Sequence, residues 1–257
     1  MLVSPQKIAS EGRIDMKTAL ITGASRGIGR AIATAFAKEG FRLVINCSSS
    51  KDALYDLRDE LIRTHHTDVL ADVGDISDHS YVHDLFARTQ ERFGGVDILI
   101  NNAGISYVGL LSEMSIDEWN RIVSVNLTSV FSTCKHAIPH MLHRQSGKII
   151  NISSIWGNVG ASCEVAYSAC KGGMNAFTRA LAKELAPSNI QVNAIACGVI
   201  DTEMNACFAK EELAALMEEI PAGRFGTPEE VAALALQLCA AGSYLTGQII
   251  TLDGGFT

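Results

Sequence analysis

Residues 18–40 read TALITGASRGIGRAIATAFAKEG, and this stretch decides the fold. Thr18–Ile21 is a short apolar run of strand character, and a glycine-rich turn follows it. Ile28, Ile32 and Phe36 then recur at i, i+4 and i+8, the spacing that places apolar side chains on one face of a helix. A strand, a tight turn and an amphipathic helix in this order predict the first βα unit of a parallel sheet.

The same alternation continues to the end of the chain. Further strands are predicted at 41–46, 69–72, 96–100, 148–152, 190–195 and 248–251. Helices are predicted at 27–39, 50–64, 80–93, 115–142, 165–186 and 228–239. Continuous apolar strands between helices predict a sheet that is covered on both faces. The expected fold is α/β, a single doubly wound parallel sheet of the Rossmann type with helices on both faces. Its ligand should lie beyond the carboxyl ends of the strands, at the switch point.

One domain accounts for almost the whole chain. We expect a single Rossmann-type catalytic domain over residues 16–257, with a substrate lid around 200–220. Residues 1–15 carry four charged side chains and no apolar core, so they do not resemble a signal peptide. We expect this extension to have no role.

Composition excludes several classes of protein. The chain has 257 residues, of which 47% are hydrophobic, and its formal net charge is −7. An acidic chain without a basic block is a poor candidate for binding nucleic acid. No apolar run approaches the ~18 residues of a membrane span, so no membrane partner is expected. The seven cysteines are dispersed and form no CxxC pair, which favours reduced thiols in the cytoplasm and no metal site.

The glycine-rich turn predicts a nucleotide site. Gly23, Gly27 and Gly29 are not spaced as G-x-G-x-x-G, but glycines here still let backbone N–H groups, including those of Ser25 and Ile28, approach a pyrophosphate.

The end of the second strand bears on which nucleotide binds. NAD sites usually carry a carboxylate there, whereas this chain has Asn46 and Ser48. With Arg26 in the turn and Lys51 nearby, these groups suit a 2′-phosphate and favour NADPH. The alternative is that Arg26 and Lys51 are solvated surface charges.

From about Lys17 to Thr257, the chain resembles the short-chain dehydrogenases/reductases. The resemblance rests on motifs in the family's order and spacing, namely Thr22–Gly29, Asp72-Val73, Asn101-Asn102-Ala103-Gly104, Asn126, Ser154, Tyr167-Ser168-Ala169-Cys170-Lys171, Asn193 and Leu252-Asp253-Gly254-Gly255. One departure is Cys197-Gly198, where the family usually has Pro-Gly. Losing the proline frees φ and restores an N–H beside the cofactor, so we expect a more mobile loop with the activity retained.

The resemblance implies roles for individual residues. Asn126, Ser154, Tyr167 and Lys171 would form the active site. The resemblance also implies cofactor contacts around the adenosine, pyrophosphate and nicotinamide, by Asp72, Val73, Asn102, Ala103, Gly104, Ile200 and Thr202. Tyr167 and Lys171 would contact the cofactor as well, Lys171 at the nicotinamide ribose. It further implies a homotetramer.

Tyr167 and Lys171 have a chemical reason to lie together. They are four residues apart in a predicted helix and so share a face. An ammonium about 4 Å from a phenol, at an effective dielectric constant of about 20, favours the phenolate by about 4 kcal/mol. We therefore expect Lys171 to lower the pKa of Tyr167 toward neutrality. The hydride would pass to the carbonyl carbon while Tyr167 protonates the carbonyl oxygen. Ser154 would hold that oxygen, and Asn126 would hold a water that relays protons to Lys171.

Two resemblances bear on the substrate, and both stay open. The segment 220–230 looks like that of the 3-oxoacyl-acyl-carrier-protein reductases of fatty acid biosynthesis. The segments 151–157 and 160–165 look like those of a bacterial subgroup that reduces a 5-aminopentanone group on elongation factor P. Trp156 could line the substrate pocket, and Glu164 could pair with a substrate ammonium. The alternative is that Glu164 caps the following helix. An acidic acyl-carrier protein would need a basic rim, for which Arg144 and Lys148 are the candidates.

A different class of protein is a remote alternative. A nucleotide-binding regulator without turnover typically loses the Tyr or the Lys, and both are present here. The expected activity is therefore NADPH-dependent reduction of a ketone to a secondary alcohol.

Overall fold

Seven parallel strands form one sheet in the order β3-β2-β1-β4-β5-β6-β7. The computed structural model describes residues 16–204 and 209–257. The predicted extension 1–15 and four residues of the predicted lid lie outside this part of the chain. The strands are β1 (Thr18–Ile21), β2 (Arg42–Cys47), β3 (Val69–Val73), β4 (Ile98–Asn101), β5 (Gly147–Ser154), β6 (Ile190–Cys197) and β7 (Ile249–Leu252).

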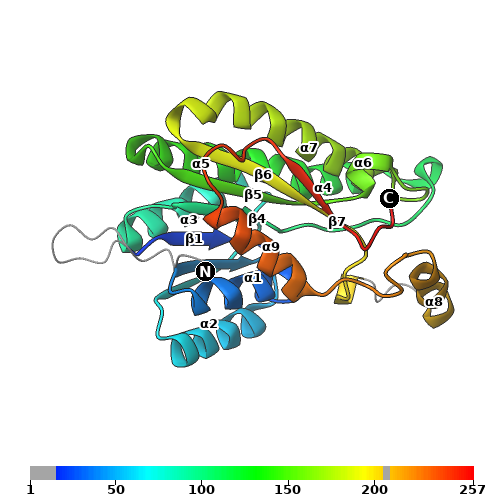
Figure 1. The fold of residues 1–257 in the computed structure, drawn as a ribbon, viewed down its shortest axis with the longest axis horizontal. Helices are drawn as coiled ribbons and strands as arrows, with labels where there is room; N and C mark the ends of the chain where they lie inside the picture. The colour runs from blue at the N-terminus through cyan, green and yellow to red at the C-terminus, as the bar shows by residue number, and fades with distance from the viewer. Residues whose placement is uncertain (1–15, 205–208) are drawn as a thin grey trace.

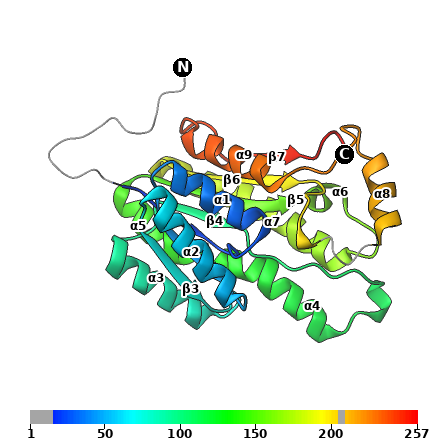
Figure 2. The same cartoon turned by 90° about the horizontal axis from the view of Figure 1, so that it is seen from below.

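Helices cover both faces of the sheet (Figures 1 and 2). They are α1 (Gly27–Lys38), α2 (Lys51–His65), α3 (His79–Phe93), α4 (Ile116–Val123), α5 (Ser129–Arg144), α6 (Trp156–Val159), α7 (Val165–Leu185), α8 (Lys210–Glu218) and α9 (Pro228–Ala240). Core residues of α1, α2 and α9 pack on one face, and those of α3, α5 and α7 on the other. The predicted doubly wound Rossmann-type sheet is confirmed.

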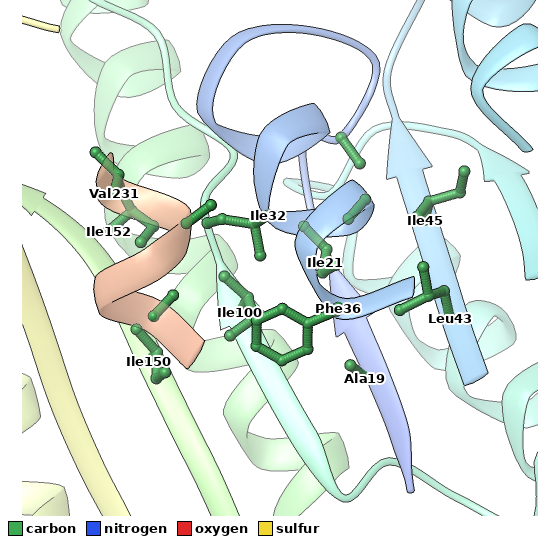
Figure 3. Packing of buried hydrophobic residues seen from close by; sticks show 14 of the residues in the cluster. Ala19, Ile21, Ile32, Phe36, Leu43, Ile45, Ile100, Ile150, Ile152 and Val231 are labelled. Carbon is green, nitrogen blue, oxygen red and sulfur yellow. The ribbon is translucent and has the colours of Figure 1, made fainter. Parts of the chain in front are cut away.

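Apolar periodicity explains how α1 is fixed to the sheet. Ile32 and Phe36 are fully buried, and Ile28 packs against the same cluster. Figure 3 shows the Phe36 ring among Ala19, Ile21 and their neighbours on the adjacent strands. Because α1 is held along its length, its N-terminal turn has a defined position above the end of β1.

The switch point lies between β1 and β4. β2 pairs with β1 on one side, and β4 pairs with it on the other. The loops that follow β1 and β4 therefore leave the same edge of the sheet and separate, which opens a crevice there.

Two local features differ from the predicted elements. The single helix predicted at 115–142 is divided into α4 and α5 by a π-helical turn, Ser124–Thr128. The short helix α6, directly after β5, was not predicted. Its four residues are too few for a periodic apolar pattern to reveal. Within the described residues, no helix combines the length and apolar character needed to span a membrane.

Candidate functional site

A cavity of about 890 Å³ lies at the carboxyl ends of the strands. Seventeen of the 21 predicted site residues line it: Gly23, Ser25, Arg26, Gly27, Ile28, Asn46, Ser48, Asn102, Ala103, Gly104, Ser154, Trp156, Glu164, Tyr167, Lys171, Ile200 and Thr202. Gly29, Asp72, Val73 and Asn126 do not line it. The cavity has a half beside the glycine-rich turn and a half beside Tyr167 and α8.

The glycine-rich turn is tied to the end of β4 by side-chain hydrogen bonds. The Asn102 amide donates to the carbonyl oxygens of Thr22 and Gly23, at 2.9 and 3.0 Å. The Thr22 hydroxyl accepts from the N–H groups of Asn102 and Ala103, both at 3.0 Å. A Cβ at Gly29 would lie 2.2 Å from the Gly23 carbonyl oxygen, so glycine is required for this close approach. Gly29 therefore shapes the turn from behind the cavity wall.

The turn fits a phosphate-bearing nucleotide. Gly23 and Gly27 have φ of +66° and +52°, a conformation that glycine adopts without strain. Gly27 faces Thr202 across the cavity, where a Cβ would come within 3.3 Å of the threonine methyl carbon. The start of α1 thus presents backbone N–H groups in an open cradle, the arrangement that favours an anion.

Polar groups also gather at the end of β2. Ser48, Ser49 and Ser50 line the cavity with Cys47. Burial raises the pKa of the Cys47 thiol, while hydrogen bonds from the backbone of Ser50 and Ser49 and from the Ser25 side chain lower it. The end of β2 itself therefore offers three serines and no carboxylate to the cavity, although Asp75, after β3, also lines it.

Arg26 is held at the rim of this half. Its guanidinium forms an ion pair with Glu203 at 2.8 Å, and both side chains are about two-thirds exposed. The pair connects the glycine-rich turn to the segment that precedes α8. Sequence reasoning placed Arg26 here but did not foresee this partner, because the two residues are 177 positions apart.

Asp72 is engaged elsewhere. Its carboxylate accepts two hydrogen bonds from Arg88, at 2.6 and 3.0 Å, and one from the Tyr81 hydroxyl at 2.8 Å. Asn46 donates to the same hydroxyl at 2.9 Å. The role that the resemblance implies for Asp72 thus depends on its backbone, because its side chain belongs to this network.

Ser154, Tyr167 and Lys171 lie together in the other half of the cavity. Ser154 ends β5, and Tyr167 and Lys171 share one face of α7. The Ser154 hydroxyl forms a hydrogen bond with Tyr167. Lys171 is 3% exposed, and its ammonium donates to the Ile152 carbonyl oxygen at 2.8 Å.

The electrostatics of Tyr167 differ from our expectation. Burial raises the pKa of its phenol above the usual value, with further increases from Cys197 and Glu164, and the Ser154 hydrogen bond only partly offsets them. Lys171 is not among the groups that dominate this pKa; its ammonium donates to the Ile152 carbonyl oxygen and lies 5.5 Å from the centre of the tyrosine ring. Tyr167 is consequently a neutral phenol at neutral pH, which is the form that can donate a proton.

Burial has the opposite effect on Lys171. It lowers the pKa of the ammonium to about 8, and neighbouring Cys197 and Cys170 only partly offset this. Cys197, which stands where the family usually has proline, lines the cavity near Tyr167 and Lys171. Its own pKa is raised to about 12 by burial, so its thiol is neutral.

Asn126 lies in the π-helical turn and is fully buried. Its amide donates to the Ile105 and Ile122 carbonyl oxygens at 2.9 and 3.0 Å, and its side-chain oxygen accepts from the Ile105 N–H at 3.2 Å. A Cβ at Gly104 would touch the Asn126 oxygen and lie 3.7 Å from the Lys171 nitrogen. Asn126 thus fixes the loop at Ile105, and the missing Gly104 side chain leaves a space that is close to both Asn126 and Lys171.

Helix α6 forms part of the wall around the substrate half of the cavity, the half beside Tyr167 and α8. The Trp156 N–H donates to the Ser154 hydroxyl oxygen at 3.2 Å. Glu164 occupies the cap position of α7 but makes no capping hydrogen bond with its side chain. Its carboxylate instead lines the cavity, where burial raises its pKa and a hydrogen bond from Trp156 lowers it. Glu164 thus stands at the cap position of the helix, as the capping alternative has it, but without a side-chain capping hydrogen bond.

Residues on α8 complete the site. Glu212, Ala215 and Leu216 line the cavity from this helix, and Glu219 lines it from the cap position that follows. Their i, i+3, i+4 and i+7 spacing could have identified them as one face, but the sequence does not indicate which face meets the cavity.

Comparison with known proteins agrees with this geometry. The short chain dehydrogenase family model matches residues 17–213. The 3-oxoacyl-[acyl-carrier-protein] reductase FabG of Aquifex aeolicus is 38% identical over 246 residues, covering 95% of this chain and 99% of the relative. The oxidoreductase YmfI of Bacillus subtilis is 37% identical over 241 residues, covering 93% and 98%. The crystal structure of YwfH, described as an NADPH-dependent reductase of bacilysin biosynthesis, superposes with a TM-score of 0.89 at 29% identity, covering 94% and 98%.

The chain belongs to the short chain dehydrogenase family. It is an oxidoreductase of the class that acts on CH–OH and C=O groups.

The buried ammonium predicts an unusual stability profile. The pKa of Lys171 is about 8 in the folded chain and about 10.4 in an unfolded one. Between these values the unfolded state binds more protons, so stability rises with pH; below about 8 the full cost of burying the charge is present. The free energy of unfolding of Lys171→Met at pH 7 should therefore be larger than that of the parent by about 1–3 kcal/mol. This difference should narrow above pH 8.

Chemical denaturation between pH 6.5 and 10, without nucleotide, measures this effect. Lys183→Met is the matched control, because Lys183 is exposed on the same helix. A gap for Lys171→Met that is independent of pH would contradict the assignment.

Proposed function

We propose that this chain is a single-domain NADPH-dependent reductase that converts a ketone to a secondary alcohol, of the 3-oxoacyl-acyl-carrier-protein reductase type. The observation that carries the proposal is the placement of Ser154, Tyr167 and Lys171 in one cavity with the glycine-rich turn. The FabG relatives support the 3-oxoacyl thioester as substrate, with an acyl-carrier protein as its carrier and fatty acid biosynthesis as the context.

The nucleotide half supports NADPH over NADH. The end of β2 offers three serines and no carboxylate to a ribose, and Arg26 stands at the rim. A guanidinium and several hydroxyl and N–H donors suit a phosphate, whereas a ribose hydroxyl is usually held by a carboxylate. Gly23, Ser25, Gly27 and Ile28 would hold the pyrophosphate.

The catalytic roles follow from the protonation states. Bound NADPH supplies the hydride for the carbonyl carbon. Tyr167 donates its phenolic proton to the carbonyl oxygen, and the Ser154 hydroxyl stabilises the charge that develops there. Lys171, partly protonated near neutral pH, would hold the nucleotide ribose and supply the proton that restores the Tyr167 phenol. Asn126 acts indirectly, by holding the loop at Ile105 and Gly104 against Lys171.

Substituting Tyr167 by Phe tests this chemistry. With acetoacetyl-CoA, the parent should oxidise NADPH much faster than NADH, and Tyr167→Phe should lose at least about 100-fold in kcat because the proton donor is removed. Nucleotide binding should change little, since the aromatic ring remains and only the hydroxyl is lost. Turnover that survives in Tyr167→Phe would contradict the assigned proton donor.

A second substrate is favoured by the charge of the cavity. Glu164, Glu212 and Glu219 line its substrate half, and within the described residues no Lys or Arg pairs with them. Arg144 and Lys148 are the candidates for a basic rim. Arg144 ends α5 and Lys148 lies at the start of β5, whereas Ser154 lies at the other end of β5. An acidic lining suits a ketone with an ammonium group. This supports reduction of a 5-aminopentanone group on elongation factor P as the second candidate.

Two ketones of the same shape separate the candidates. One is a pentan-2-one with a terminal trimethylammonium group, and the other carries a tert-butyl group there. If the second candidate holds, kcat/KM should favour the cation by about tenfold, and Glu164→Gln should remove most of this preference. Glu184→Gln, at the far end of α7, is the control and should retain it. Equal rates for the two ketones in the parent would leave the acyl thioester as the substrate.

We also propose a cytoplasmic homotetramer. The six cysteines that the structure describes are free thiols, which suits a reducing compartment. Phe131 is 50% exposed on the outer side of α5, where a second subunit could cover it.

A further inference from the structure

The C-terminal tail, residues 253–257, folds back after β7 and ends beside α6 (Figures 1 and 2). The Asp253 carboxylate holds this turn. It accepts hydrogen bonds from the N–H groups of Gly255 and Thr257, at 3.0 and 2.9 Å, and from the Thr257 hydroxyl at 2.9 Å. Gly254 and Gly255 have φ of +66° and +87°, so the chain reverses direction here without strain.

This turn places Phe256 against Trp156. The two ring centroids are 5.8 Å apart and the rings are inclined at 65°, an edge-to-face arrangement that is favourable for aromatic pairs. Phe256 itself lies outside the cavity lining, whereas Trp156 is part of it. The tail therefore reaches the site through one side chain.

Trp156 connects this contact to the site in two ways. Its backbone N–H donates to the Ser154 hydroxyl oxygen at 3.2 Å. Its side chain forms the hydrogen bond with Glu164 that lowers the pKa of that carboxylate. A change in the orientation of the indole would alter both the width of the substrate half and the position of its nearest carboxylate.

The inner side of α6 is fixed independently of the tail. Gly157 packs against the Lys171 backbone so closely that a Cβ there would lie 2.6 Å from the Lys171 carbonyl carbon. The Asn175 amide donates to the Asn158 side-chain oxygen at 2.9 Å. These contacts hold the helix backbone, and they leave the half-buried Trp156 ring to be oriented from outside, where Phe256 lies.

We propose that Phe256 is a positioning residue for the substrate half of the cavity. Asp253 folds the tail, the tail holds Phe256 against Trp156, and Trp156 sets the position of Glu164 and of the wall next to Ser154. The proposal rests on the proposed reductase function, since it requires a ketone to enter this half. It concerns recognition of the ketone, because Phe256 contacts neither the predicted proton donor nor the nucleotide half.

Steady-state kinetics and tryptophan fluorescence together test the proposal. The chain has two tryptophans, so Trp119→Phe makes Trp156 the single reporter. In that background Phe256→Ala should raise KM for acetoacetyl-CoA or the trimethylammonium ketone by about three- to tenfold, the range of one aromatic pair. The kcat should change less than about twofold and the Kd for NADPH should be unchanged. Trp156 emission should shift to the red and become easier to quench with acrylamide, as the ring is released.

Three further variants keep the test specific. Phe256→Tyr should restore most of the parent KM and emission, because it keeps the ring. Asp253→Asn should shift both in the same direction as Phe256→Ala, because it weakens the turn. Tyr244→Ala is the control, since Tyr244 is a fully exposed aromatic ring in the loop before β7.

The outcomes separate the two proposals. An unchanged KM and unchanged emission in Phe256→Ala would overturn the positioning role while the reductase function stands. A parallel loss of kcat, NADPH affinity and thermal stability would also overturn it, in favour of general structural damage. Absence of turnover with either ketone in the parent would contradict the reductase function and the positioning role that rests on it.

Discussion

The Asn102 amide holds the glycine-rich turn against the end of β4 by donating to two successive carbonyl oxygens, those of Thr22 and Gly23. A parallel sheet sends the loops after β1 and β4 apart at the switch point, so a crevice forms there without further cause. The two Asn102 hydrogen bonds fix the backbone that forms the floor of this crevice. Because Gly29 has no side chain, the start of α1 can approach this floor and present its backbone N–H groups to a ligand.

Burial is the second constraint, and it decides the chemistry of the opposite half. The Lys171 ammonium is withdrawn from solvent, and this burial lowers its pKa to about 8 although the ammonium donates to a backbone carbonyl. The Tyr167 phenol is withdrawn as well, and its pKa rises. Desolvation penalises the charged form of each group, which moves the two pKa values in opposite directions. The result is a neutral phenol beside a lysine that can gain and lose a proton near neutral pH.

The sequence was sufficient for the fold and for most of the site, because both depend on local patterns. The Ile28, Ile32 and Phe36 spacing located α1, and glycines and polar residues at strand ends located the cavity. What it could not supply was long-range geometry. The Arg26–Glu203 pair, the capture of the Asp72 side chain by Arg88, and the distance from Lys171 to Tyr167 all arise when distant segments meet. The π-helical turn at Asn126 lies within a continuous helical pattern, so the pattern does not reveal it. Helix α6 is too short to show a periodic pattern.

The cavity thus differs along its length, with serines at the end of β2 and carboxylates around Trp156 and α8. The most direct test of this difference is nucleotide titration by calorimetry of the parent chain and of Ser48→Asp. The account predicts that the parent prefers NADPH, and that the new carboxylate weakens NADPH by more than about tenfold while NADH binds at least as well as before, since a carboxylate repels a 2′-phosphate and accepts from a ribose hydroxyl. Equal affinity of the parent for both nucleotides, or no response to Ser48→Asp, would contradict it.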